Sequence, residues 1–130
     1  MSVVREMLIA AHRATAAVAG LRIRYTSAGR TCEIDAALRG HTEYETIDAT
    51  GTVRTQLTDA DFILVRDDLV LGARLQEPAR GDQVTILDGP ERGALYEVLP
   101  PPGLQCWRKS DPHGALIRIH TKQILDPQAA

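Results

Sequence analysis

The stretch that decides the fold consists of three short pieces: Arg80-Gly81-Asp82-Gln83-Val84-Thr85-Ile86, Tyr96-Glu97-Val98 and Gln105-Cys106-Trp107. The first two alternate apolar with polar residues, which is the pattern of a β-strand with one buried face. The sequences between the pieces, Asp88-Gly89-Pro90 and Pro100-Pro101-Pro102-Gly103, are rich in turn-forming residues. Strands joined by such short connections form a meander, which is typical of a small β-barrel or sandwich.

The same two-residue period continues on both sides of this stretch. Leu21, Ile23 and Tyr25 alternate with arginines, and the alternation resumes after a turn at Ser27-Ala28-Gly29-Arg30. Further strands are predicted over residues 31–36, 53–57, 62–65, 83–87, 94–99, 104–109 and 115–124. On their apolar side we expect one barrel core, which includes Val84, Ile86, Tyr96, Val98, Trp107 and Ile119.

The first part of the chain has a helical period. One face of residues 2–19 carries apolar residues at three- and four-residue spacing, and Gly20 ends the run. We expect this apolar face to dock on the barrel. Its residues are Val4, Met7, Leu8, Ala11, Ala14 and Val18. The opposite face carries Arg5, Glu6, His12 and Arg13, and also Ile9, which is either an ordinary exposed aliphatic residue or part of a second contact surface.

The segment from Leu38 to Gly51 has neither period. It is mostly polar and contains Gly40-His41-Thr42-Glu43-Tyr44-Glu45 and Asp48-Ala49-Thr50-Gly51. A connection of this length without its own apolar period is uncommon in a compact domain and is usually functional or disordered. We therefore expect a long polar loop here and regard it as the best candidate for a working segment.

Length and composition restrict both the domain layout and the partners. With 130 residues, of which 44% are hydrophobic, the chain can bury one core. We expect a mainly β protein, a small β-barrel with an N-terminal α-helix and the long polar loop. The single domain divides into a helix over residues 2–19, a β-barrel over 21–125 and a short C-terminal tail over 126–130. The formal charge of −2 argues against a protein that grips DNA, because such a grip requires a basic face.

The sequence offers no catalytic pattern. Its four histidines and two cysteines do not fall at metal-ligand spacings, so we expect no metal, no cofactor and no enzymatic activity. Cys32 and Cys106 are expected to be buried free thiols. The acidic pairs Asp59/Asp61 and Asp67/Asp68 fit turn and cap positions better than an acid-base or cation site. His120, on a predicted strand, is expected to be hydrogen-bonded or solvated and not a catalytic base.

A membrane location is also not expected. No charged segment followed by an apolar run opens the chain, and no apolar run approaches the ~20 residues that a membrane-spanning helix needs. We expect a soluble protein, present in the cytoplasm when it is made, with no membrane partner.

The order of the elements resembles the head–tail joining proteins of lambda-like phages and their prophage relatives, which are also described as head-completion, connector or stopper proteins. The similarity covers residues 3–125 and departs from the lambda-type pattern in the long strand at 115–124. Besides the helix, the hairpin and the polar loop, it rests on Phe62, Asp67-Asp68-Leu69, Arg80-Gly81-Asp82, Tyr96-Glu97-Val98 and Cys106-Trp107. The resemblance implies a structural β-barrel protein that forms a ring beneath the portal and its adaptor, bridges to the tail and helps to retain packaged DNA.

The resemblance also implies roles for particular segments. The loop would point at the DNA channel or at the tail-facing rim, through Gly40, His41, Glu43, Tyr44, Glu45 and Asp48. The helix face with Arg5, Ile9 and Arg13 would contact a neighbour. The implied partners are copies of the chain in a ring, of six subunits rather than twelve, the portal and adaptor proteins, the tail terminator or tail tube, and double-stranded DNA passing through the channel. The implied location is the virion neck, after assembly in the host cytoplasm.

Two other interpretations stay open at this point. A tail terminator, or another ring protein of the tail tube, also combines a helix with a β-sheet and differs mainly in its partner. An oligonucleotide-binding barrel would need exposed aromatic residues on a basic sheet face. Trp107 beside Arg108 and Lys109 is the only local feature of that kind.

Overall fold

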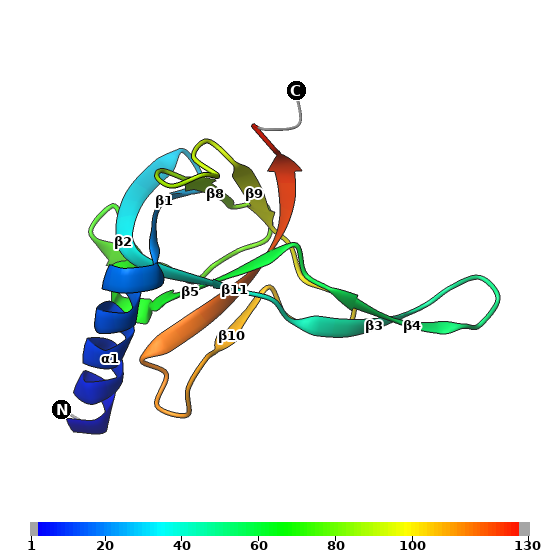
Figure 1. Ribbon diagram of the computed structural model, residues 1–130, viewed down its shortest axis with the longest axis horizontal. Helices are drawn as coiled ribbons and strands as arrows, with labels where there is room; N and C mark the ends of the chain where they lie inside the picture. The colour runs from blue at the N-terminus through cyan, green and yellow to red at the C-terminus, as the bar shows by residue number, and fades with distance from the viewer. Residues whose placement is uncertain (1–2, 128–130) are drawn as a thin grey trace.

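The structure is a computed structural model that describes residues 3–127, and its central feature is a β-barrel (Figure 1). The strands of the main sheet are β1 (Leu21–Ser27), β2 (Arg30–Gly40), β5 (Ala60–Val65), β8 (Gln83–Ile86), β9 (Leu95–Val98), β10 (Trp107–Lys109) and β11 (Leu116–Leu125). They are ordered β10-β11-β5-β2-β1-β8-β9, and β11 also pairs with β9, so six strands close into a barrel and β10 is an additional strand. The expected mainly β class, with a small barrel and an N-terminal helix, is confirmed.

Six further elements lie outside the main sheet. They are α1 (Val3–Ala19), the hairpin of β3 (Glu43–Ile47) and β4 (Val53–Leu57), the short 3-10 helix η1 (Arg66–Asp68), and the small pair of β6 (Val70–Leu71) and β7 (Arg74–Leu75). The helix begins at Val3 among the described residues. Ser2 of the predicted helix and residues 128–130 of the predicted tail lie outside them.

The barrel interior holds the core. Inward-facing residues alternate along each strand, as the two-residue period predicts. Phe62 and Tyr96 meet edge to face in its centre, with ring centroids 5.2 Å apart. Of the core residues expected from the sequence, five are fully buried in one cluster: Val84, Ile86, Tyr96, Val98 and Ile119.

Trp107 differs from that expectation. It lies on β10, outside the closed barrel, and is only half-buried against the edge of the core. The guanidinium of Arg66 covers its ring at 5.1 Å from the centroid. The reason is topological, because β10 pairs with β11 alone and therefore cannot direct a side chain into the closed interior.

We expect Trp107→Ala to lower the free energy of unfolding by about 2 kcal/mol, less than the roughly 3–5 kcal/mol typical of a fully buried aromatic residue. The measurement is urea denaturation followed by circular dichroism. Leu104→Ala, an exposed position close by in the chain, is the matched control and should change the midpoint little. A loss as large as that of a core aromatic would contradict this placement of the ring.

Helix α1 docks with the face opposite to the predicted one. Its buried residues are His12 and Ala16, and Ile9 is half-buried. Of the predicted docking face, Leu8 alone is half-buried and the other five residues are exposed. The ring nitrogen Nε2 of His12 lies 2.7 Å from the carbonyl oxygen of Ala36 in β2. Arg5 donates to Asp67 at 2.8 Å, and Arg13 donates to both carboxylate oxygens of Asp68, at 3.0 and 3.1 Å. Polar contacts therefore hold the helix to the barrel, and the prediction that its apolar face docks there is wrong.

As a consequence, α1 exposes its apolar face. Val18 is 91% exposed and Met7 is 66% exposed. At 3.6 residues per turn the exposed apolar residues cover an arc of about 100°, as wide as the stripe that a surface helix normally buries. We call this arc the outer stripe, and it consists of Val3, Val4, Met7, Ala11, Ala14 and Val18.

The two cysteines are free thiols, as predicted, but they are half-buried at the margin of the core and not fully buried. Burial raises the pKa of both Cys32 and Cys106. The Cys106 thiol also donates to the carbonyl oxygen of Pro78 at 3.4 Å. At neutral pH both groups therefore remain protonated thiols of low reactivity.

Candidate functional site: a projecting hairpin and its buried anchor

The polar segment after β2 forms a β-hairpin and not a loop. Strands β3 and β4 pair in continuous register from Glu43 opposite Leu57 to Ile47 opposite Val53. Figure 1 shows the hairpin projecting from the barrel, and we call it the arm, residues 43–57. Strand β4 matches the strand predicted over residues 53–57. Because the arm projects into solvent, neither of its faces is buried, and β3 shows no apolar alternation although it is also a strand.

The two faces of the arm differ in character. Cross-strand partners lie on the same face. One face carries Glu43, Glu45, Ile47, Val53, Thr55 and Leu57, and the other carries Tyr44, Thr46, Arg54 and Gln56. Ile47 is 73% exposed and Val53 is 56% exposed. The arm thus presents an apolar pair near its tip and an acidic pair near its root on one face, and a polar surface on the other.

Asp48 shapes the turn at the arm tip. Its Oδ1 accepts hydrogen bonds from the Thr50 hydroxyl at 2.6 Å and from the backbone N–H groups of Thr50 and Thr52 at 2.9 and 3.0 Å. These bonds, with that of the Thr50 hydroxyl first, lower the pKa of Asp48. Gly51 supplies the left-handed conformation, φ +81°, that the turn needs. Asp48 is therefore a turn-forming residue that keeps the tip in one shape.

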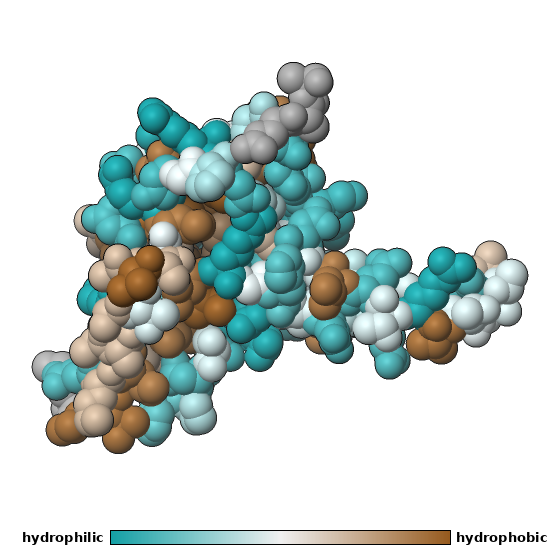
Figure 2. Space-filling view, viewed as in Figure 1, coloured by the Kyte–Doolittle hydropathy of each residue, from teal (hydrophilic) through white to brown (hydrophobic). Residues whose placement is uncertain are grey.

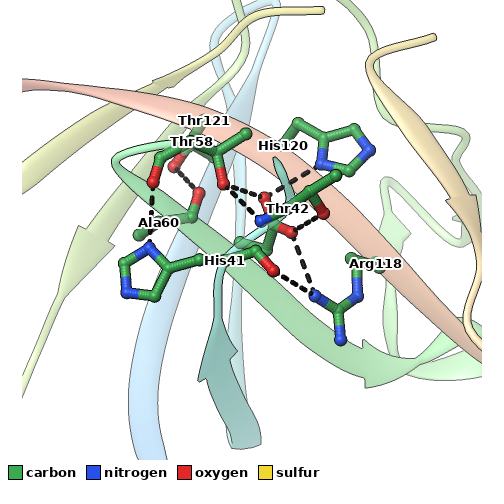
Figure 3. Close-up of polar contacts among 8 residues, drawn as sticks. His41, Thr42, Thr58, Ala60, Arg118, His120 and Thr121 are labelled. Atoms are coloured by element: carbon green, nitrogen blue, oxygen red, sulfur yellow. Dashed lines mark hydrogen bonds and ion pairs between the residues drawn. The ribbon is translucent and has the colours of Figure 1, made fainter. Parts of the chain in front are cut away.

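The root of the arm is tied to the barrel through one buried carboxylate. Asp61 in β5 is completely buried. Figure 3 shows the polar contacts around this position, with Thr42, Thr58, Arg118 and His120 labelled. The Oδ1 atom of Asp61 accepts from the Thr58 hydroxyl at 2.8 Å and lies 2.9 Å from Nδ1 of His120. Its Oδ2 accepts from Arg118 at 3.1 Å and from the Thr42 hydroxyl. Thr42 and Thr58 flank the arm, so this carboxylate joins both ends of the arm to β5 and β11, and we call these five residues the anchor.

Backbone contacts reinforce the anchor. Thr58 N–H donates to the Thr42 carbonyl at 2.9 Å, and Thr42 N–H donates to the Thr58 hydroxyl at 2.9 Å. His41 Nδ1 lies 2.9 Å from the Thr58 carbonyl oxygen, and Arg118 donates to the His41 carbonyl at 3.1 Å. A Cβ on Gly40 would lie 3.2 Å from the Arg118 guanidinium, so a larger residue there would crowd the anchor. The arm is therefore fixed in direction at its root.

The anchor also determines the charge state of Asp61. Burial alone would raise the pKa of this carboxyl, but hydrogen bonds from His120, Thr42 and Thr58 outweigh it and lower the pKa to about 2. Each donor in the anchor therefore faces a carboxylate at all pH values above this range. His120 and Asp61 are both closed to solvent, so the pair serves the structure of the arm root.

The free energy of unfolding should depend on pH because the pKa of Asp61 is lowered in the folded state. A carboxyl whose folded pKa lies below its ordinary value of 3.8 stabilises the fold above that value, and this contribution is lost as the pH falls toward about 2. We expect the free energy of unfolding to drop by about 2 kcal/mol from this group between pH 5 and pH 2. Urea denaturation at a series of pH values measures it, and Asp61→Asn should remove that part of the pH dependence. An unchanged slope in the variant would contradict the assignment.

The structure brings some of the predicted site residues together and leaves others apart. Gly40, His41, Glu43, Tyr44, Glu45 and Asp48 follow one another along the root and first strand of the arm. Arg5, Ile9 and Arg13 lie on the inner side of α1, where both arginines already pair with Asp67 and Asp68. Their contact with a neighbouring subunit stays a prediction.

Four residues of the anchor were not foreseen as parts of a site. The sequence pattern favours a turn role for Asp61 and indicates no particular role for Thr42, Thr58 or Arg118. His120 was expected to be hydrogen-bonded or solvated, and the structure places it in a buried hydrogen bond with Asp61. One feature of the sequence could have indicated the anchor. In residues 115–124 an arginine and a histidine alternate with isoleucines, and this pattern places polar side chains on the outer side of a central strand, where they need partners.

The anchor is bordered by a small open groove of about 190 Å³. Tyr44 of the arm, Lys122 of β11 and the proline run 100–102 line it. Within residues 3–127, no group of three or more His, Cys, Asp or Glu side chains is arranged to hold a metal ion. No helix in this part of the chain is long and apolar enough to cross a membrane.

Comparison with known proteins adds one finding. The chain matches the family model described as phage head-tail joining protein over residues 1–128. A comparison with curated proteins gives no match. The matched range spans the helix, the barrel and the arm.

Proposed function

Since this chain belongs to the family of phage head-tail joining proteins, we propose that its barrels form a ring in the virion neck, between the portal with its adaptor and the tail. The family is one of structural proteins that connect head and tail, and the observation that carries the proposal is the family match over residues 1–128. In this ring each barrel is the rigid unit and each arm is the part that extends beyond its own subunit.

The arm is the segment through which the ring acts on its surroundings. It projects from the barrel, it is rigid at its root and shaped at its tip, and most of its side chains are exposed. A ring of such subunits carries a ring of arms, directed at the channel or at the tail-facing rim. Gly40 and His41 at the root, and Glu43, Tyr44, Glu45 and Asp48 in the arm, are the residues that we place there.

Charge fits a channel through which DNA passes. The chain has a net charge of −2, and the arm carries Glu43, Glu45 and Asp48 against a single Arg54. Such a surface does not neutralise phosphates and therefore does not hold DNA in place by counterion release. Retention of packaged DNA would then come from closing the channel physically, with the anchored arms as the obstacle. Its protein partners in this role are the portal and adaptor on one side and the tail terminator or tail tube on the other.

An image reconstruction of the particle neck tests the proposal. We expect a ring of small barrels between the portal-adaptor assembly and the tail, with one arm per barrel. A tail terminator would instead lie at the head-proximal end of the tail tube before the head is joined. Imaging of isolated tails therefore distinguishes a tail terminator from a neck ring protein. Particles in which the neck lacks the chain, or isolated tails that already carry it, would contradict the proposal.

A further inference from the structure

The outer stripe of α1 is exposed and is not covered by any other part of residues 3–127. A helix docked on a barrel normally turns its charged residues to water and its apolar residues inward. Here Arg5 and Arg13 face the barrel side and pair with Asp67 and Asp68, while Val3, Val4, Met7 and Val18 face outward. Figure 2 shows the resulting apolar surface along the helix. Inverted patterning of this kind indicates a surface that is covered by another protein chain.

The arm provides a second apolar surface at the other end of the molecule. Ile47 and Val53 are direct cross-strand partners near the tip, and both are exposed. Leu57 continues the same face toward the root and is also exposed. A two-stranded hairpin without a packing partner is only marginally stable in water, so the distal arm gains from a surface to lie on. Figure 1 shows α1 and the arm on opposite sides of the barrel, so they cannot meet within one subunit.

We propose that the arm of one subunit packs its Ile47–Val53 face on the outer stripe of α1 in the next copy of the chain. This contact joins two different surfaces, so it is heterologous and repeats from subunit to subunit until a ring closes. The inference rests on the proposed ring and deepens it, because it names the surfaces through which the subunits meet. It also assigns the polar face of the arm, with Thr46 and Arg54, to the side turned away from the neighbour.

Dimensions support this pairing of surfaces. The 17 residues of α1 span about 25 Å, and the five-residue strands of the arm span about 17 Å. The arm can therefore lie along the helix without extending past its ends. Alanines at positions 11 and 14 in the middle of the stripe leave room for the larger Ile47 and Val53 side chains to approach closely.

The charges of the two surfaces also support the contact between the arm and the outer stripe. The arm is acidic, with Glu43, Glu45 and Asp48 against Arg54, whereas α1 contains Arg5 and Arg13 against Glu6. The outer stripe itself is uncharged, so it brings no like charge against Glu43 and Glu45, which lie on the contacting face of the arm. A contact of two arms would bring acidic segments together, which is less favourable.

A mixing experiment with two complementary variants tests the contact. The helix variant carries Met7→Glu with Ala14→Glu, both on exposed positions of the stripe. The arm variant carries Ile47→Lys with Val53→Glu, an opposite-charge cross-strand pair that keeps the hairpin paired. Thr46→Glu, opposite Arg54 on the other face of the arm, is the matched control. Circular dichroism verifies that each chain is folded, and sedimentation velocity over a concentration series measures association.

The expected results separate the heterologous contact from its competitors. Wild type and the Thr46→Glu control should associate as concentration rises, and each double variant alone should stay monomeric. An equimolar mixture of the two variants should form heterodimers of twice the monomer mass and nothing larger, because one intact helix stripe and one intact arm remain per pair. An arm variant that still dimerises alone would show stripe-to-stripe pairing, and wild type that stays monomeric throughout the series would assign the stripe to a different neck protein. Either result overturns the proposal.

Disulfide trapping gives an independent readout. In a background of Cys32→Ala and Cys106→Ala, one chain carries Met7→Cys and a differently tagged chain carries Ile47→Cys. Oxidation of the mixture should yield cross-linked heterodimers in large excess over either homodimer. Equal yields of all three species would contradict a specific contact. The trap reports only on contacts between copies of the chain. Its failure would refute the contact between arm and outer stripe without refuting a location in the neck. A neck reconstruction that lacks this chain would refute that location without changing the trapping result.

Discussion

Replacing Asp61 by asparagine should lower the free energy of unfolding by about 3–5 kcal/mol, because it leaves the Arg118 and His120 side chains of the anchor without the buried carboxylate that they face. This is a large part of the 5–15 kcal/mol that typically holds a domain of this size together. The amide has the shape of the carboxylate, so the loss reflects charge and hydrogen bonding and not a cavity. Urea denaturation followed by circular dichroism measures it.

The neighbouring Asp59 provides the control for this experiment. Asp59 is exposed and accepts one hydrogen bond, from the backbone N–H of Gln123 at 2.8 Å. Asp59→Asn should therefore shift the denaturation midpoint little. In Asp61→Asn, amide exchange at Thr42 and Thr58 should also accelerate, because both amides belong to the root of the arm. Equal stability of the two asparagine variants would show that the anchor does not hold the arm.

Shortening the arm should abolish function while the barrel stays folded. Residues 45–55 can be replaced by Asn-Gly, which forms a tight turn between the cross-strand partners Tyr44 and Gln56 and leaves the anchor intact. The distal arm buries little, and loop-closure entropy changes slowly with length, so the stability change should stay within about 1 kcal/mol. Particles assembled with this variant should lose DNA or fail to join tails.

Electron microscopy of particles from a complementation assay measures the outcome as the fraction of full heads that carry tails. Ala49→Ser, at the exposed tip of the arm, is the matched control and should give normal particles. A normal yield of filled, tailed particles with the shortened arm would show that this segment is only a connection between β2 and β5.

Sequence patterns predicted the barrel because its strands have one buried face each. Along Tyr96-Glu97-Val98 and Val84-Thr85-Ile86 the alternation is clear, since every second side chain enters the core. The same reasoning predicted the second strand of the arm, over residues 53–57, but missed the first, because Glu43–Ile47 pairs as a strand with both of its faces exposed to solvent. An apolar period detects a strand with one buried face, and where neither face is buried it cannot distinguish a strand from a loop.

The error about α1 has a different origin. Helical periodicity predicted the helix and its apolar face correctly over Val3–Ala19. The rule that this face docks inside applies to a chain whose surfaces are complete. His12 and Ala16 pack inward here, and Met7 and Val18 do not. The anchor was hidden for a third reason, because Thr42, Asp61 and His120 lie far apart in the chain and meet only through the pairing of β5 with β2 and β11.

Strand β11 gives the molecule a definite order of events during synthesis. It pairs with β10, β5 and β9, and it also supplies Arg118 and His120 to the anchor. Before residues 116–125 have left the ribosome, the barrel cannot close and the arm root cannot be fixed. Contacts between such distant segments form late and slowly. A nascent or prematurely terminated chain thus has neither a closed barrel nor a directed arm, and it enters the pool of assembly subunits only when its last strand is in place.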